Sequence, residues 1–178
     1  MKTFKSVLFL FLLSTLIISC SNDDDAGDSG TTGGGGEAFS AKIDGADFAA
    51  STNPATLIGG TFTTTNGTSL LTGQGSTNNG DFINFSIIDF NGPGTYTTGD
   101  NISNTNQIQY GELVGQTANV WASNLASASV GGLQAGEITI TSQDDNGAEG
   151  TFSFEGYNAA DMSTKMISEG QFKISFDN

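Results

Sequence analysis

The 178-residue sequence contains no histidine and no arginine, and their absence removes several kinds of chemistry at once. Without histidine, the usual side chain for acid–base work near neutral pH is missing, and a Ser-His-Asp arrangement is impossible. Cys20 is the only cysteine, which excludes disulfides and cysteine-rich zinc sites. The sequence also lacks a lysine-containing phosphate loop and a dinucleotide fingerprint. We therefore expect no bound cofactor.

Positive charge is also scarce. Five lysines stand against 19 acidic residues, a formal charge of −14. Only Lys42, Lys165 and Lys173 lie beyond residue 19, so the remainder has three positive and 19 negative side chains, a charge of −16. Binding to a nucleic-acid backbone needs clustered cations, and we expect no nucleic-acid partner. An acidic surface rich in small polar residues fits an exported protein that charge keeps soluble.

Residues 1–19 have the three parts of a secretory signal. Lys2 and Lys5 form a positive start, and an almost entirely apolar run follows over residues 7–18. This run is shorter than the ~20 apolar residues of a membrane-spanning helix. We therefore interpret the segment as a cleaved signal peptide.

The end of this signal, Leu16-Ile17-Ile18-Ser19-Cys20, resembles a lipobox. The resemblance implies a diacylglycerol on the Cys20 sulfur, cleavage before Cys20, and acylation of the new amine by a fatty acid such as palmitate. Each buried CH₂ stabilises membrane binding by ~0.8 kcal/mol, so two or three chains anchor a protein almost irreversibly. We therefore expect a lipoprotein that is anchored to a membrane through Cys20.

Residues 20–37 have the composition of a flexible tether. They are rich in Gly, Ser, Thr and Asp and have too few apolar side chains to offset the entropy of ordering. Ser21-Asn22-Asp23-Asp24-Asp25, directly behind Cys20, resembles the acidic export signal of Bacteroidota surface lipoproteins. That resemblance implies the outer face of the outer membrane, whereas a plain solvated linker is the alternative.

Residues 38–178 are long enough for one domain with its own core, and their pattern is that of β-strands. Apolar and polar residues alternate with period two, which places one face of each strand in a core. The clearest runs are Ile138 to Ile140, Phe152 to Phe154 and Phe172 to Phe176. Residues 83–88 are apolar enough for a central strand that is buried on both faces.

Turn signals separate these runs at short spacing. Asn66-Gly67, Asn79-Gly80 and Asn146-Gly147 supply the positive φ angles of tight hairpin turns. The clearest hairpin joins residues 137–142 to residues 150–154. Residues 158–167 fit a loop and a strand better than a helix. We expect an all-β domain, an antiparallel sandwich or barrel of about 8–11 short strands.

Several of these segments together resemble one family. They are a strand–turn–strand unit over residues 39–48, a turn entering a strand at Gly92-Pro93-Gly94-Thr95-Tyr96, the hairpin described above, and a final strand over residues 170–174. The order is similar to that of small Bacteroidota lipoproteins known only as a domain of unknown function. The resemblance covers most of residues 38–178. It implies the fold and no active-site residue.

Three groups of residues are candidates for a site in the domain. Carboxylates that could form a hydrolytic pair are Asp44, Asp47, Glu137, Glu149 and Glu155. The acidic segment 143–149, with Asp144 and Asp145, could offer oxygen ligands to calcium, although a solvated hairpin turn explains it better. Trp121, Tyr96 and Tyr110 could form a sugar-stacking platform, although a single Trp in a β protein is more often part of the core. Residues 101–109 are predicted to be a long polar loop.

The leading functional expectation is a non-enzymatic surface lipoprotein that binds a ligand or partner, such as a glycan or an outer-membrane protein. One alternative is a carboxylate-dependent hydrolase. The other is a carrier of apolar ligands, resembling calycins, which would need an apolar cavity of ~300 Å³ or more.

Overall fold

The computed structural model describes residues 36–52 and 56–176. The predicted signal peptide, Cys20 and nearly all of the predicted tether lie outside these ranges. In the described part of the chain, no helix has the length and apolar character that a membrane crossing requires.

Eleven strands and one short helix make up the described part of the domain. They are β1 (Ala38–Ile43), β2 (Ala46–Ala49), β3 (Ile58–Thr65), β4 (Thr68–Ser76), β5 (Phe82–Ile88), β6 (Gly94–Thr98), β7 (Gln107–Val114), β8 (Thr117–Ser123), α1 (Leu125–Val130), β9 (Gly136–Gln143), β10 (Gly147–Tyr157) and β11 (Thr164–Ser175). The expected all-β class and strand number are confirmed.

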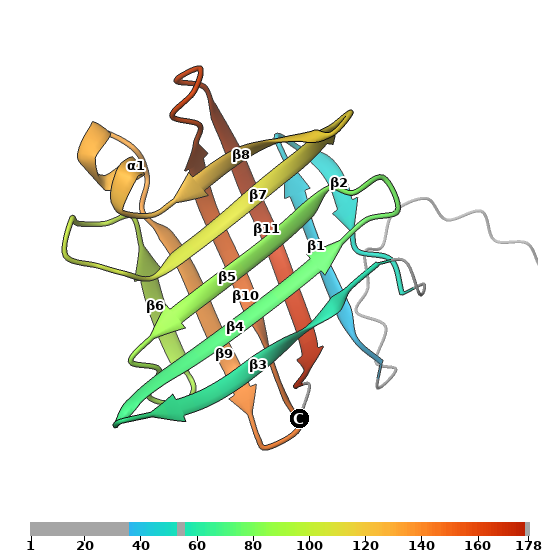
Figure 1. Cartoon of the computed structure of the whole chain (residues 1–178), viewed down its shortest axis with the longest axis vertical. Helices are drawn as coiled ribbons and strands as arrows, with labels where there is room; N and C mark the ends of the chain where they lie inside the picture. Colours follow the sequence, from blue (N-terminus) through green and yellow to red (C-terminus); the bar gives the residue numbers. More distant parts are fainter. Residues whose placement is uncertain (1–35, 53–55, 177–178) are drawn as a thin grey trace, which may run out of the picture. The chain divides into compact units, whose positions relative to one another are not determined.

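The strands pair antiparallel in the order β2-β1-β11-β10-β8-β7-β5-β4-β3, and β6 and β9 branch from β10. The branch exists because β10 is long: its first part pairs with β9, while Tyr157 at its end pairs with Ala122 of β8. An isolated parallel bridge between Gly60 and Phe176 brings β3 to the end of β11. The sheet is therefore curled into a half-barrel, with β3, β4, β5 and β7 in front of β9, β10 and β11 in Figure 1.

Phenylalanine rings fill the space inside the curl. Phe39 lies 5.3 Å from Phe152 and 6.0 Å from Phe172, and Phe85 lies 5.0 Å from Phe172, all measured between ring centroids. These rings come from both walls of the half-barrel and each is at most 4% exposed. The interior thus holds side chains where a calycin-like carrier would hold its ligand, and the carrier alternative has no support.

Two local predictions are confirmed. Residues 137–142 and 150–154 form the β9–β10 hairpin in register, with Phe152 opposite Ile138. After turns over residues 159–161, the chain enters β11 at Thr164, so residues 158–167 are a loop and a strand.

Two other local predictions are wrong in part. β5 is central, between β4 and β7, but it is buried on one face only: its alternate residues Asn84, Ser86 and Ile88 point outward. The predicted loop over residues 101–109 ends at residue 106, because Gln107 already pairs with Ser86.

Candidate functional site

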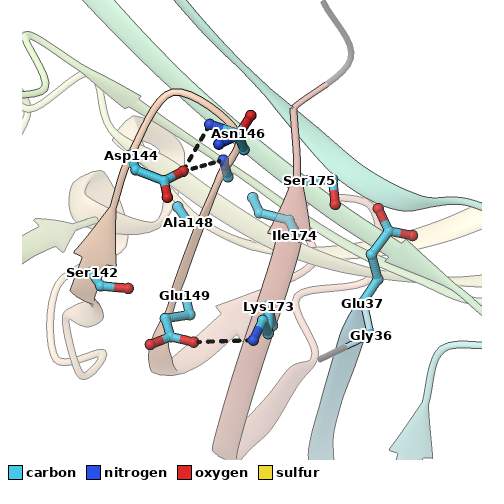
Figure 2. A pocket seen from close by; sticks show the side chains of 11 residues that line it. Gly36, Glu37, Ser142, Asp144, Asn146, Ala148, Glu149, Lys173, Ile174 and Ser175 are labelled. Atoms are coloured by element: carbon cyan, nitrogen blue, oxygen red, sulfur yellow. Dashed lines mark hydrogen bonds and ion pairs between the residues drawn. The ribbon is translucent and has the colours of Figure 1, made fainter. Parts of the chain in front are cut away.

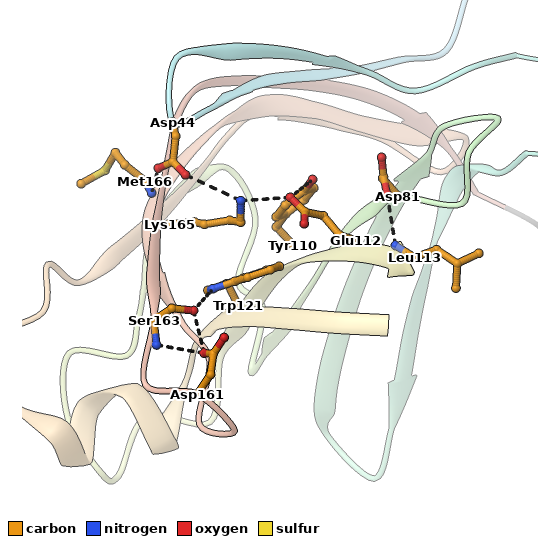
Figure 3. A network of polar contacts seen from close by, with 10 residues as sticks. All are labelled: Asp44, Asp81, Tyr110, Glu112, Leu113, Trp121, Asp161, Ser163, Lys165 and Met166. Atoms are coloured by element: carbon orange, nitrogen blue, oxygen red, sulfur yellow. Dashed lines mark hydrogen bonds and ion pairs between the residues drawn. The ribbon is translucent and has the colours of Figure 1, made fainter. Parts of the chain in front are cut away.

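Tyr110 and Trp121, two of the three candidate aromatics, do lie together. They face each other across β7 and β8 with stacked rings 6.0 Å apart. Both are covered, at 5% and 6% exposure, and the Nζ atom of Lys165 lies 4.6 Å from the centre of the Trp121 ring (Figure 3). An ammonium group over an indole is attracted by the ring electrons. The two rings therefore offer no open face to a sugar.

Acidic groups hold the lysine in this place. Lys165 lies 3.0 Å from Glu112 and 3.7 Å from Asp44, measured from Nζ to the carboxylate oxygens. The Tyr110 hydroxyl donates to Glu112 at 3.1 Å. Burial, and secondly this hydrogen bond to a carboxylate, raise the pKa of Tyr110 well above its usual value.

The indole N–H of Trp121 also has a hydrogen-bond partner. Its Nε1 donates to the Ser163 hydroxyl at 2.8 Å, and that hydroxyl donates to Asp161 at 2.7 Å. The hydrogen bonds from the Ser163 side chain and backbone lower the pKa of Asp161. Figure 3 shows these groups around the indole. The cluster uses its polar atoms internally, as a structural network does.

Tyr96 belongs to a different aromatic group. Its ring packs 5.5 Å from Phe90, and its hydroxyl donates to the Gly92 carbonyl at 2.6 Å while accepting from the Asn91 N–H at 3.0 Å. The hydroxyl thereby closes the turn before β6. The three candidate aromatics do not form one platform.

Three of the five candidate carboxylates form ion pairs. Asp47 lies 3.1 Å from Lys42, Glu149 lies 3.8 Å from Lys173, and Asp44 makes the ion pair described above. Asp44 also accepts the backbone N–H of Met166 at 2.8 Å, which ties the β1–β2 turn to β11. These carboxylates have structural partners.

Glu137 and Glu155 lie on the same face of two neighbouring strands. Glu137 on β9 pairs in register with Ser153 on β10, and Glu155 follows two residues later, so the two are diagonal neighbours on the outer surface. Glu155 accepts the backbone N–H of Gln134 at 2.9 Å.

The acidic segment around Asp144 forms the tight turn of the β9–β10 hairpin. Its carboxylate accepts the N–H groups of Asn146 and Gly147 at 2.7 and 3.1 Å (Figure 2). Beside it lies an open groove of about 350 Å³ that Glu37, Glu149 and Lys173 help to line. Among the residues described, no cluster of three or more metal-binding side chains exists here or elsewhere.

A second groove, of about 260 Å³, lies on the outer surface of β4, β5 and β7. We call the six polar side chains that the strand register places there the neutral face: Thr72, Gln74, Asn84, Ser86, Gln107 and Gln109. They form two rows across the strands. Gln74, Asn84 and Gln109 are register partners, and so are Thr72, Ser86 and Gln107. These strands lie toward the viewer in Figure 1.

The amides of the neutral face have spare hydrogen-bonding capacity. Within the described ranges, the side chains of Gln74, Asn84, Gln107 and Gln109 make no hydrogen bond to another protein group. A carboxamide offers two donors and an acceptor oxygen. Strands separated by 4.7–4.9 Å hold these groups at regular spacing on a rigid surface. The face can therefore make several hydrogen bonds to an uncharged ligand.

Sequence reasoning missed the neutral face. The alternation at Asn84 and Ser86, and again at Gln107 and Gln109, was a usable signal for outward polar residues. The sequence did not reveal that β5 pairs with β7, because residues 89–106 lie between the two strands and β6, the next strand in the chain, pairs with β9 instead.

The fold defines a small all-β domain built on one curled antiparallel sheet. The model of the family described as a domain of unknown function (DUF6252) matches residues 36–174, and the chain belongs to this family. The expected kinship with a family of unknown function is thus confirmed. No curated protein and no solved structure matches the chain.

Proposed function

We propose that this chain is a lipoprotein anchored through Cys20 at the outer face of the outer membrane, and that its β domain binds a ligand without catalysing a reaction. The observation that carries the binding role is the neutral face, where the amides of Gln74, Asn84 and Gln107 share a groove and make no hydrogen bond to the rest of the described chain. Elsewhere in the domain, the half-buried amides of Asn104 and Asn106 complete a loop by donating to the Thr97 carbonyl.

The binding role can be tested on the full-length protein in detergent by hydrogen exchange, with and without outer-membrane extract separated into protein and polysaccharide fractions. We expect one fraction to slow exchange at residues 72–74, 84–86 and 107–109, because a bound ligand covers these strands. Protection elsewhere, or none with either fraction, would contradict a binding role for this face.

The anchor is tested separately. A Cys20→Ala protein should leave the membrane fraction and keep residues 1–19, since lipidation and cleavage both require the thiol. Mass spectrometry of the unmodified protein should show a diacylglyceryl group on residue 20. A Cys20→Ala protein that is cleaved and still membrane-bound would rule out this anchor.

The hydrolase remains the second candidate because Glu137 and Glu155 are diagonal neighbours on one surface. Profiling the protein against glycoside and ester substrates decides between the two. Turnover that disappears in both Glu137→Gln and Glu155→Gln proteins would favour the hydrolase, and we expect no such turnover.

A further inference from the structure

Taking the proposed binding role as its basis, we propose that the ligand of the neutral face is an uncharged glycan, which lies across β4, β5 and β7. Three properties of this surface suit such a ligand: it carries no charge, its amides have no hydrogen-bond partner in the described chain, and an aromatic ring lies at its border.

The neutral face carries no charge, although the chain as a whole is acidic. The chain carries 19 acidic residues and five lysines. On β4, β5 and the start of β7, every described side chain on the outward register positions is uncharged. These positions hold Thr68, Leu70, Thr72, Gln74, Ser76, Phe82, Asn84, Ser86, Ile88, Gln107 and Gln109. A cationic ligand would find no carboxylate here and an anionic ligand no lysine, while the net charge of −14 repels acidic polymers.

The amides select for hydroxyl groups. A sugar hydroxyl both donates and accepts, and a carboxamide can serve it in either role. Purely apolar ligands are disfavoured, because covering amides that lack partners costs about 1–3 kcal/mol for each group left unsatisfied. Thr72 adds a fixed group to the row, since its hydroxyl is bonded to the Thr61 hydroxyl at 2.9 Å and accepts the Thr61 N–H at 3.2 Å.

An aromatic ring borders the amides. Phe82 begins β5, points outward and is half-buried. Its ring lies against Gly111 of β7, so closely that a Cβ atom on that glycine would come within 2.3 Å of the ring. Because Gly111 has no side chain, the Phe82 ring can pack flat against the sheet, two residues from Asn84. Sugar rings have apolar C–H faces that pack on aromatic rings.

The groove is open and shallow, and its volume of about 260 Å³ is below the ~300 Å³ at which enclosed ligand pockets begin. Such a surface suits an extended chain that is held at repeated points. The strand spacing of about 4.8 Å is close to the length of one sugar ring, so neighbouring strands can serve neighbouring units.

The test measures binding of the full-length protein in detergent to defined hexasaccharides by affinity electrophoresis and calorimetry. The neutral probes are cellohexaose, xylohexaose, mannohexaose and chitohexaose. Hexagalacturonate is the anionic probe and a chitosan hexamer the cationic one. We expect at least one neutral probe to bind and the anionic probe not to bind.

Single variants locate the site. Asn84→Ala and Gln107→Ala should each weaken binding of that neutral probe at least about fivefold, the effect of losing one hydrogen bond. Phe82→Leu keeps an apolar side chain but loses the flat ring, and should weaken binding to a similar degree. Gln171→Ala is the matched control, because Gln171 is an exposed amide on β11 and should leave affinity unchanged.

The inference fails if none of the four neutral probes binds, if hexagalacturonate binds equally well, or if Asn84→Ala keeps full affinity. It can fail while the binding role survives. In that case the hydrogen-exchange experiment would show protection of the neutral face by the protein fraction alone.

Discussion

Among single residues, Thr98 and Ser123 form a buried polar pair whose hydroxyl groups link three strands. Thr98 is fully buried and Ser123 is 1% exposed. The Thr98 hydroxyl donates to Ser123 at 2.8 Å, while the Ser123 hydroxyl donates to the Thr98 carbonyl and accepts the Gly136 N–H. One hydroxyl thus joins the ends of β6 and β8 to the start of β9.

Ser123→Ala should therefore lower the free energy of unfolding by about 1–3 kcal/mol, because it leaves the Thr98 hydroxyl and the Gly136 N–H buried without partners. Urea unfolding measures the change. Ser153→Ala is the control, since Ser153 lies half-buried on the outer face of β10 and should change stability by less than ~0.5 kcal/mol. Equal effects would contradict the role given to the Ser123 hydroxyl.

Tyr110 gives a second residue-scale prediction, on pH. Its pKa is raised in the folded state by burial and by the hydrogen bond to Glu112, so folding favours the neutral phenol. Tyr110 therefore stabilises the folded state fully at any pH below its unfolded pKa of about 10. As the pH rises above 10, this contribution to the free energy of unfolding is lost by at most ~1.4 kcal/mol per pH unit.

Tyr110→Phe removes this titration. The variant should be less stable than the unmodified protein at pH 8, because the hydrogen bond to Glu112 is gone, and the difference between the two should shrink between pH 10 and 11.5. Denaturant unfolding across this range gives both curves. A constant difference would show that the phenol does not titrate differently in the folded state.

Among the elements, β6 shows how the domain protects an open strand edge. β6 pairs only with β9, so its second edge has no strand partner in the described sheet. The side chains of Asn104 and Asn106 occupy that edge, donating to the Thr97 carbonyl at 2.8 and 3.2 Å. Asn106 also accepts the Ile88 N–H at 2.9 Å. The polar loop predicted at this place therefore has a structural role.

Asn106→Ala should weaken the attachment of β6, because the Thr97 carbonyl loses one of its donors and the Ile88 N–H loses its acceptor. We expect faster hydrogen exchange at residues 94–98 and a loss of about 1–2 kcal/mol in stability. Gln116→Ala, in the β7–β8 turn, is the control and should change neither quantity. Unchanged exchange in β6 would show that other groups hold its edge.

For the described domain as a whole, the main requirement is room for the phenylalanine rings inside the curled sheet. Two glycines of β4 provide it: a Cβ atom on Gly73 would lie 2.5 Å from the Phe85 ring, and one on Gly75 would lie 2.6 Å from Phe39. Close packing of this kind leaves no space for added volume.

Gly73→Ala should accordingly destabilise the domain by about 1–3 kcal/mol, since the new methyl group displaces the Phe85 ring. Gly59→Ala is the matched control on β3, where the nearest atom to the new methyl group would be 3.7 Å away. It should be neutral or slightly stabilising, because alanine lowers the entropy of the unfolded chain. Urea unfolding compares the two, and equal losses would contradict a filled interior.

The sequence by itself determined the all-β class, the β9–β10 hairpin and the lack of histidine and cysteine in the domain. These properties depend on local alternation, on turns such as Asn66-Gly67, where both residues have positive φ angles, and on residue types. Asn146 and Gly147 have no positive φ angle, so the expected type of turn is wrong there: the Asp144 carboxylate accepts their N–H groups instead. It could not reveal the short helix α1, whose six residues are too few for a helical period and depend on the Asn124 cap. Only the tertiary structure showed that Lys165 covers Trp121 and that Gln74, Asn84 and Gln109 form one row. Strand pairing brings these residues together from distant parts of the chain, and local sequence does not encode which strands pair.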